Sequence, residues 1–332
     1  MDFTKPIDVQ AVIGAVKDHR DLMVTLDSEA AADMLQHFTA IPGVKDSLTL
    51  GRTTLAKVSH KYTGQFVGTK EAGAIVPRTL KVYPCVMEMD DEPERYRRTY
   101  LTEVKGGLDP EAHPFEIWLL NYGIKSASQE LHDVMLTAKE SSSGTDLKDS
   151  FDGLMTIIED EKNKGNFAKA KDNLFQTGAL TRANIGDQLL EMYRSMPNTF
   201  RKKADQKLYL SADLGDMYDD WLNDQGYLVL SQMTETTGQK YLRGTNGKLE
   251  IVRLTNLPEG SQFVMMTSKL NVVYGYDTDA DFQSLMPFVG GNPYHFTAAG
   301  KYVIGFQLVS LDKSEVCIND QPVTPPTADA GE

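Results

Sequence analysis

Residues 113–144 read HPFEIWLLNYGIKSASQELHDVMLTAKESSSG and form the most regular segment of the chain. The apolar residues of this segment recur at alternating spacings of three and four, and they are Ile117, Leu120, Ile124, Ala127, Leu131, Val134 and Ala138. Since this spacing places them on one face of an α-helix, it predicts a helix of about 25 residues, roughly 40 Å long. Pro114 suits the first turn of a helix, and the serines before Gly144 mark its end. The heptad pattern is short, and the chain also contains segments with strand character. We therefore favour one helix that lies across a sheet, and a coiled coil is the alternative.

The segment before this helix, residues 48–108, has the character of strands. Glycines recur at positions 51, 64, 68 and 73, and the run Thr79–Tyr83 alternates polar with apolar side chains. No compact hydrophobic cluster accompanies these strands, so we predict a long two-stranded excursion. Residues 1–47 are expected to form an arm of short helices, one of which runs through residues 30–35 to a stop at Pro42 and Gly43. An ordinary N-terminal helical subdomain is the alternative.

The charges of residues 48–108 are segregated. Residues 52–81 carry six cations against the single acid Glu71, whereas residues 88–94 carry five carboxylates. Such an acidic run is typical of a solvated tip, and a cation site is the less favoured reading. A more specific hypothesis is that the basic excursion of one subunit meets the acidic tip of another, because charge complementarity fixes register at interfaces. The candidate contact residues are Lys57, Lys61, Lys70, Arg78, Lys81, Asp90, Asp91, Glu92 and Glu94.

The chain beyond the helix changes from helical to strand-rich. Residues 145–225 predict amphipathic helices near 151–158, 185–196 and 215–222, with a short buried strand at Lys207–Leu210. From residue 226 onward we predict strands at 227–230, 249–254, 263–266, 271–274 and 302–311. The proline-containing tail, residues 321–332, is expected to be disordered. The fold class is therefore α+β.

Composition excludes several classes of function. The formal charge of −13 over 332 residues argues against a surface that grips nucleic acid, although a container that encloses DNA can have an acidic lining. The start of the chain predicts no secretory signal, and no apolar run is long enough to cross a membrane. Cys85 and Cys317 are isolated in the sequence and are expected to be inert, reduced thiols.

No catalytic, cofactor or metal motif is found in the sequence. The six histidines stand without a partner at ligand spacing, and the run Asp277–Asp281 begins like a calcium loop but has Phe282 where that loop needs glycine. The fragment Gly244–Leu249 lacks the spacing of a phosphate loop. We predict that the protein is not an enzyme and needs no cofactor. The competing hypothesis is an enzyme or carbohydrate-binding module whose pocket is lined by Tyr274, Tyr276, Phe288 and Tyr294.

The order of these parts resembles a known architecture. A helical arm, a two-stranded excursion, one long helix, a helical region and returning strands are similar to the Hong Kong 97-type capsid fold of tailed-bacteriophage major capsid proteins. Local strings resemble the group found in phages and prophages of Bacteroides-like bacteria, and they are Phe151–Leu154, Thr181–Ile185, Leu189–Pro197, Lys207–Ser211 and Asn271–Gly275.

The resemblance implies a division of the chain. It assigns residues 1–47 to the N-terminal arm, 48–108 to the extended E-loop, 109–144 to the spine helix of the P-domain, 145–270 to the A-domain, 271–320 to strands that return to the A- and P-domains, and 321–332 to the tail.

The resemblance also implies a function. The expected protein is a major capsid protein that self-assembles into pentamers and hexamers, forming an icosahedral shell around double-stranded DNA. Scaffolding, portal and decoration proteins are its expected partners, assembly is expected in the cytoplasm of the bacterial host, and the mature location is the virion. An encapsulin compartment of the same fold is the alternative.

Overall fold

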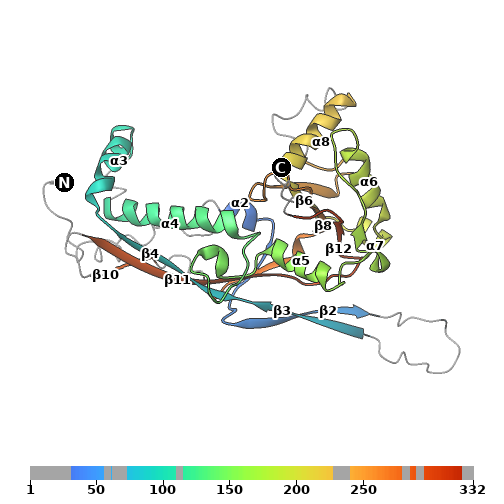
Figure 1. Cartoon of the computed structure of the whole chain (residues 1–332), viewed down its shortest axis with the longest axis horizontal. Helices are drawn as coiled ribbons and strands as arrows, with labels where there is room; N and C mark the ends of the chain where they lie inside the picture. The colour runs from blue at the N-terminus through green and yellow to red at the C-terminus, as the bar shows by residue number, and fades with distance from the viewer. Residues whose placement is uncertain are drawn as a thin grey trace, which may run out of the picture.

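The computed structural model describes residues 31–55, 61, 73–109, 115–226, 240–278, 285–288 and 295–323. These residues form two five-stranded sheets, one two-stranded sheet and the helices that cover them (Figure 1). The molecule is elongated, with the first sheet along its long axis and the second sheet at one side. The α+β class predicted from the sequence is confirmed.

The first sheet is built around the long strand β11 (Phe296–Leu308). One part of β11 pairs antiparallel with β4 (Tyr83–Asp91) and β10 (Met286–Phe288), and its last residues pair with β9 (Val272–Gly275). β1 (Thr39–Ile41) adds in parallel to β9. β11 therefore pairs with strands that come from distant parts of the chain.

The helix α4 (Phe115–Val134) lies along this sheet, as the apolar spacing predicts. Ile117, Leu120, Ile124 and Leu131 have no exposed surface, whereas Ala127 and Val134 are half-buried. The predicted length was wrong, because the helix has 20 residues and ends at Val134. The spacing continues to Ala138 because Met135, Leu136 and Ala138 stay in the same core after the helix has ended. The Gly153 amide donates a hydrogen bond of 2.8 Å to the Ala138 carbonyl and holds this segment in place.

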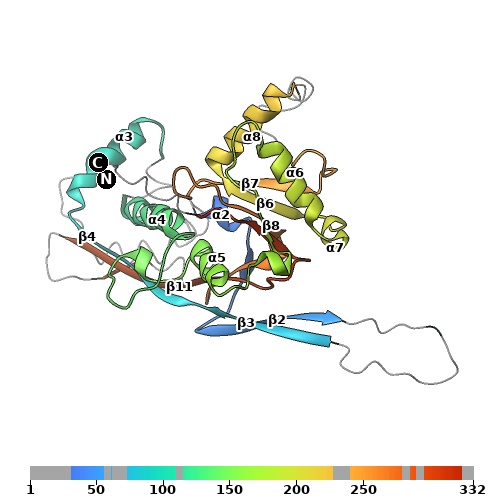
Figure 2. The same ribbon diagram turned by 45° about the vertical axis from the view of Figure 1, so that its right-hand side comes forward.

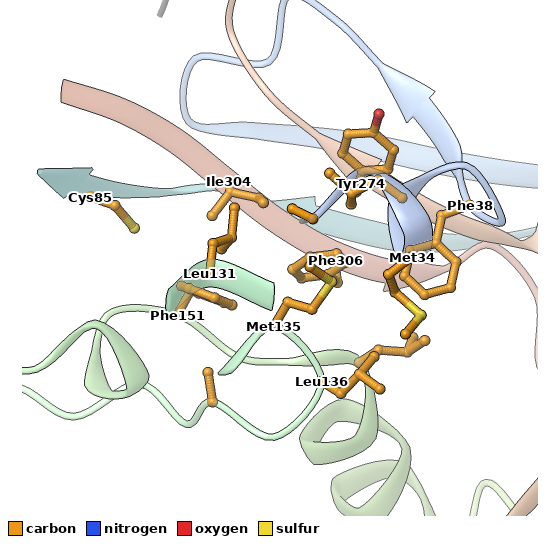
Figure 3. Packing of buried hydrophobic residues seen from close by; sticks show 14 of the residues in the cluster. Met34, Phe38, Cys85, Leu131, Met135, Leu136, Phe151, Tyr274, Ile304 and Phe306 are labelled. Carbon is orange, nitrogen blue, oxygen red and sulfur yellow. The ribbon is translucent and has the colours of Figure 1, made fainter. Parts of the chain in front are cut away.

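The core between α4 and the first sheet also takes in the N-terminal segment. Figure 3 shows Met135 and Phe306 close to Phe38, and Met34 from α2 (Ala32–Leu35) lies on the same side. The rings of Phe38 and Phe306 lie 6.2 Å apart. Residues 31–38 are thus part of the main core. The rest of the predicted helical arm, residues 1–30, lies outside the described residues.

The second sheet has the strand order β5-β12-β8-β6-β7. Its strands are β5 (Leu174–Phe175), β6 (Gln206–Ser211), β7 (Leu249–Leu254), β8 (Val264–Ser268) and β12 (Val316–Asn319). Its helices are α6 (Ile185–Ser195), α7 (Asn198–Arg201) and α8 (Ala212–Asp224), and they close a separate hydrophobic core with it. Ser211 begins α8 by accepting a hydrogen bond from the amide of Leu214, which satisfies a free amide of the first turn.

Smaller elements complete the chain. The helix α5 (Leu154–Asn163) packs beside β11, and single 3₁₀ turns occur at Leu147–Asp149, Lys169–Lys171 and Lys269–Asn271. The helix α3 (Glu94–Lys105) follows β4 directly.

The hairpin β2 (Ser47–Leu55) and β3 (Gly73–Lys81) forms the two-stranded sheet and projects from the end of the molecule opposite α3 (Figure 2). The predicted two-stranded excursion is confirmed for these residues, whereas 83–91 join the first sheet and 94–105 are helical.

Several sequence predictions match closely. The strand at 249–254 is β7, the buried strand at 207–210 is β6, and the helix at 185–196 is α6. The predicted strand at 302–311 is shifted, because β11 begins at Phe296 and ends at Leu308. The predicted strand at 227–230 lies outside the described residues. The disorder predicted for residues 321–332 is wrong at its start, because Val323 is buried in the main core, and residues 324–332 lie outside the described residues. The domain boundaries stay a prediction.

Candidate inter-subunit surfaces

The hairpin β2–β3 is buried at its base and exposed farther along at Val76 and Pro77, which point to opposite faces. Val76 is 66% exposed and Leu48 is 39% exposed, and Pro77 and Thr79 are exposed as well. Leu80, close to the base, is fully buried, because it packs with Val82 and Val273 in a small cluster. A two-stranded sheet with no apolar face covered is marginal in water. The projecting part of the hairpin therefore has little support within its own chain.

Arg78 fastens the hairpin to the rest of the molecule. Its Nε donates to the carbonyl of Leu308 at 2.7 Å, and its Nη2 donates to Oε1 of Gln307 at 2.8 Å. Its Nη1 lies 3.4 Å from Oε2 of Glu161, and both side chains are almost buried. Arg78 thus serves the fold of its own chain, a role that its place in the basic run did not reveal.

The carboxylate of Glu161 is kept ionised by these neighbours. Burial raises its pKa, but hydrogen bonds from Asn166 and Arg78 and the charges of Arg78 and Lys164 outweigh burial, so the pKa lies below its ordinary value. The hairpin base therefore depends on an ion pair that acid would break.

The other basic candidates differ in position. Lys81 is exposed, and its Nζ lies 4.3 Å from the centre of the Tyr83 ring, which is a cation–π distance. Lys61 is exposed. Lys57 and Lys70 lie outside the described residues. Two of the basic candidates are thus placed on the surface of the molecule.

The acidic candidates Asp90, Asp91, Glu92 and Glu94, called the acidic corner from here on, lie where β4 turns into α3. The Tyr96 hydroxyl donates to Asp91 at 2.6 Å, and the Glu92 amide donates to it at 2.7 Å. The hydrogen bonds from Tyr96 and Glu92, with a further one from Arg95, hold the pKa of Asp91 below its ordinary value. Asp91 is thus ionised and fixed in orientation.

The remaining carboxylates of the acidic corner also have partners in the same chain. Asp90 Oδ1 lies 2.9 Å from His295 Nδ1 at the start of β11, and Glu94 pairs with Arg97 at 2.9 Å. Arg97 offsets the charge of Glu94 and so reduces the net charge of the acidic corner. Any contact made there would set register more than it would add affinity.

The hairpin and the acidic corner lie at opposite ends of the molecule. Figures 1 and 2 show the hairpin projecting at one end of the long axis and α3 standing at the other. One chain cannot bring the two surfaces together without unfolding. A contact between them needs two copies in a head-to-tail arrangement, which generates rings or open arrays.

The thiols and the potential metal ligands bear on the hypothesis of an enzyme. In the part of the chain that the structure describes, no three side chains of the His, Cys, Asp and Glu types cluster as metal ligands. Cys85 and Cys317 are buried and unpaired, and burial raises the pKa of each thiol to about 12. Both thiols are therefore protonated and unreactive at neutral pH.

The aromatic pocket of the competing hypothesis does not form. Tyr274 belongs to the main core and pairs with Phe306, whereas Phe288 is 46% exposed and pairs with Thr297. The two β11 partners are nine residues apart (306 − 297), or roughly 30 Å along a strand. Tyr294 lies outside the described residues. Tyr274 and Phe288 thus cannot line one pocket.

None of the helices in the described ranges has the length and apolar character needed to cross a membrane.

Comparison with known proteins identifies the fold. No protein-family model and no curated protein matches the sequence. Among solved structures, the chain is similar to one described as the satellite phage P4 procapsid including size determination (Sid) protein, with a TM-score of 0.53 and 12% identity over 94% of this chain and 98% of that one. It is also similar to the capsid of an empty GTA particle, with a TM-score of 0.51 and 12% identity over 88% of this chain and 90% of that one. The chain has the Hong Kong 97-type fold of phage capsid proteins.

Proposed function

We propose that this chain is the major capsid protein of a tailed bacteriophage. In this proposal it assembles into pentamers and hexamers that form an icosahedral shell around double-stranded DNA, with a structural role and no catalysis. The observation that carries the proposal is the hairpin β2–β3, which projects from a capsid fold and is exposed at Val76 and Pro77, beyond its buried base. Because such a hairpin is marginal alone, a neighbouring copy is the natural source of its missing contacts.

Further expectations follow from the same proposal. The subunit would assemble in the cytoplasm of the bacterial host, end in the virion and meet scaffolding, portal and decoration proteins. A relationship to capsid proteins of Bacteroides-type phages rests on the sequence strings alone. The net charge of −13 supports an acidic shell that lets enclosed DNA slide past it and keeps free subunits soluble.

Electron microscopy of the purified chain tests the proposal. The full chain should give closed polyhedral particles, or pentameric and hexameric rings, when it is concentrated. A shortened variant, in which Asn-Gly replaces residues 52–76, keeps the Gly51–Pro77 pair and the Arg78 anchor but removes the projecting strands. It should stay monomeric.

Circular dichroism and thermal melting serve as controls for folding of the shortened variant. A full chain that remains monomeric at every concentration would contradict the proposal, and so would a shortened chain that assembles as readily as the full one. Particles that contain enzymes and no nucleic acid would favour the encapsulin alternative.

A further inference from the structure

We propose that an open cavity beside α6 and α7 binds the phosphate groups of a ligand. The cavity has a volume of about 710 Å³ and lies between Tyr193 at the end of α6, the short helix α7 and the loop 241–248. Four cationic side chains line it, and they are Arg201, Lys202, Arg243 and Lys248. No aspartate or glutamate belongs to its described lining. This concentration of positive charge is unusual in a chain whose net charge is −13.

The loop 241–248 is shaped to present backbone amides. Asn246 and Gly247 both have left-handed backbones, with φ of 61° and 71°, and the amide of Lys248 donates to the carbonyl of Thr245 at 3.3 Å. Among the described residues, the amides of Asn246 and Gly247 make no hydrogen bond. Amides held together in such a turn form concave sites for anions.

Among the described residues, no carboxylate forms an ion pair with Arg201, Lys202 or Lys248. Arg201 Nη2 donates to Oδ1 of Asn198 at 2.6 Å, but its Nε is buried and has no acceptor within the described chain. Lys202 is exposed, and Lys248 Nζ donates a long hydrogen bond of 3.5 Å to the carbonyl of Arg201. The guanidinium of Arg201 therefore keeps its positive charge at the wall of the cavity.

The donor set fits phosphate better than a single carboxylate. A guanidinium, two ammonium groups and free amides offer donors from several directions, which suits a tetrahedral oxyanion with more than one charge. The volume of the cavity leaves room for adjacent phosphates. Two sources share this chemistry, a free ligand such as pyrophosphate or a nucleotide, and the backbone of a nucleic acid. The inference does not depend on shell assembly.

Isothermal titration calorimetry of the full chain, with pyrophosphate and with a short DNA duplex in separate titrations, tests this inference. The triple variant Arg201→Gln, Lys202→Gln and Lys248→Gln should bind weaker by about tenfold or more, because charge-assisted hydrogen bonds are lost. A control with the same change in charge removes exposed lysines elsewhere, by Lys45→Gln, Lys105→Gln and Lys139→Gln, and should bind like the native chain.

The titrations also separate the two sources. Binding of pyrophosphate alone assigns the site to a free ligand, and tighter binding of the duplex that the triple variant loses assigns it to nucleic acid. If the triple variant melts early, the double variant Lys202→Gln and Lys248→Gln leaves the Arg201–Asn198 hydrogen bond in place and should still weaken binding. The inference is overturned if neither ligand binds saturably, if the variants bind as the native chain does, or if citrate binds as tightly as pyrophosphate.

Discussion

At the scale of single residues, Gly305 decides how closely the hairpin base approaches the first sheet. A Cβ at this position would lie 2.0 Å from the backbone carbonyl oxygen of Lys81 and 3.0 Å from Cα of Val82. Both neighbours are backbone atoms, so no rotation of a side chain can relieve the overlap. The chain crossing between β3 and β4 therefore needs glycine on β11.

The variant Gly305→Ala should destabilise the protein by roughly 3 kcal/mol or more, because backbone must move to admit one methyl group. Thermal melting followed by circular dichroism measures the effect. Gly123→Ala is the matched control, since its Cβ would meet only the ends of the Leu285 and Met89 side chains, at 3.2 and 3.3 Å. Helix propensity favours alanine there by up to about 1 kcal/mol, so a change no larger than that is expected. Equal melting of the two variants would show that the close crossing does not exist.

The Arg78–Glu161 pair makes the hairpin base sensitive to acid. The pKa of Glu161 lies below its ordinary value of about 4.5, so the unfolded chain takes up its proton before the folded chain does. The stability that Glu161 contributes is full above that value and is lost as pH falls through its folded pKa. Melting temperatures should therefore drop below pH 4.5, and the drop should be shallower in Glu161→Gln, which melts lower than the native chain at pH 7. Parallel pH profiles would rule this contribution out.

At the scale of elements, α3 is held to α4 by aromatic side chains. The Tyr100 ring is fully buried and lies 5.2 Å from the ring of Phe115 and 5.6 Å from that of Trp118. The Trp118 indole also donates to the Glu103 carboxylate at 2.7 Å. Most other residues of α3 are exposed or half-buried, so this one contact face fixes the helix beside the acidic corner.

Tyr100→Ala should cost about 3 kcal/mol and release α3, because it removes the only fully buried side chain of that helix. Trp118 fluorescence should shift to longer wavelength as its ring becomes hydrated, and Trp221→Phe removes the signal of the only other tryptophan. Tyr122→Ala is the control, since Tyr122 is 47% exposed and stacks on the same Trp118 ring. It should cost less than about 1 kcal/mol. An unshifted spectrum in Tyr100→Ala would mean that α3 is held by other contacts.

Elements with a strong local pattern could be predicted from the sequence, and elements defined by distant partners could not. The helix α4 is predicted by its periodic apolar residues, and the strand β6 by its continuous apolar run. Neither prediction needs knowledge of the elements that pack against α4 or β6. β1 has three residues and exists because β9, more than 230 residues later, pairs with it. α3 was missed because its one buried anchor, Tyr100, is hidden among charged residues that suggested an exposed tip.

The candidate contact residues show the same limit. Charge segregation along the sequence pointed to the hairpin and the acidic corner, but the partners of Arg78 come from α5 and from the last residues of β11, far away in sequence. The sequence of a basic run does not show which of its residues pair with a carboxylate that is distant in sequence. The structure separates Arg78, which fastens its own hairpin, from Lys61 and Lys81, which lie on the surface.

At the scale of the whole molecule, the separation of the hairpin from the acidic corner is the feature that bears on assembly. In the proposed assembly, the two surfaces at opposite ends of an elongated subunit would let each copy contact one neighbour ahead and one behind, and closure of the ring would multiply modest contacts. Charge at these surfaces would guide the approach of subunits and reject wrong registers. Assembly should therefore slow as salt is raised, since exposed charges are screened beyond roughly 8 Å at physiological ionic strength.

Reversal of charge at both surfaces tests this arrangement. Changing the acidic corner, by Asp90→Lys, Asp91→Lys and Glu92→Lys, should block assembly and leave a folded monomer. Changing the basic residues between β2 and β3 in the sequence, by Lys57→Glu, Lys61→Glu and Lys70→Glu, should do the same. A chain with all six changes should assemble again, because opposite signs face each other once more.

Reversal of three exposed acids elsewhere, by Asp133→Lys, Glu140→Lys and Asp160→Lys, controls for net charge. Sedimentation velocity and negative-stain images measure assembly. Two results would show that the hairpin of one copy does not meet the acidic corner of the next. They are normal shells from the acidic-corner variant, and a chain with all six changes that stays monomeric.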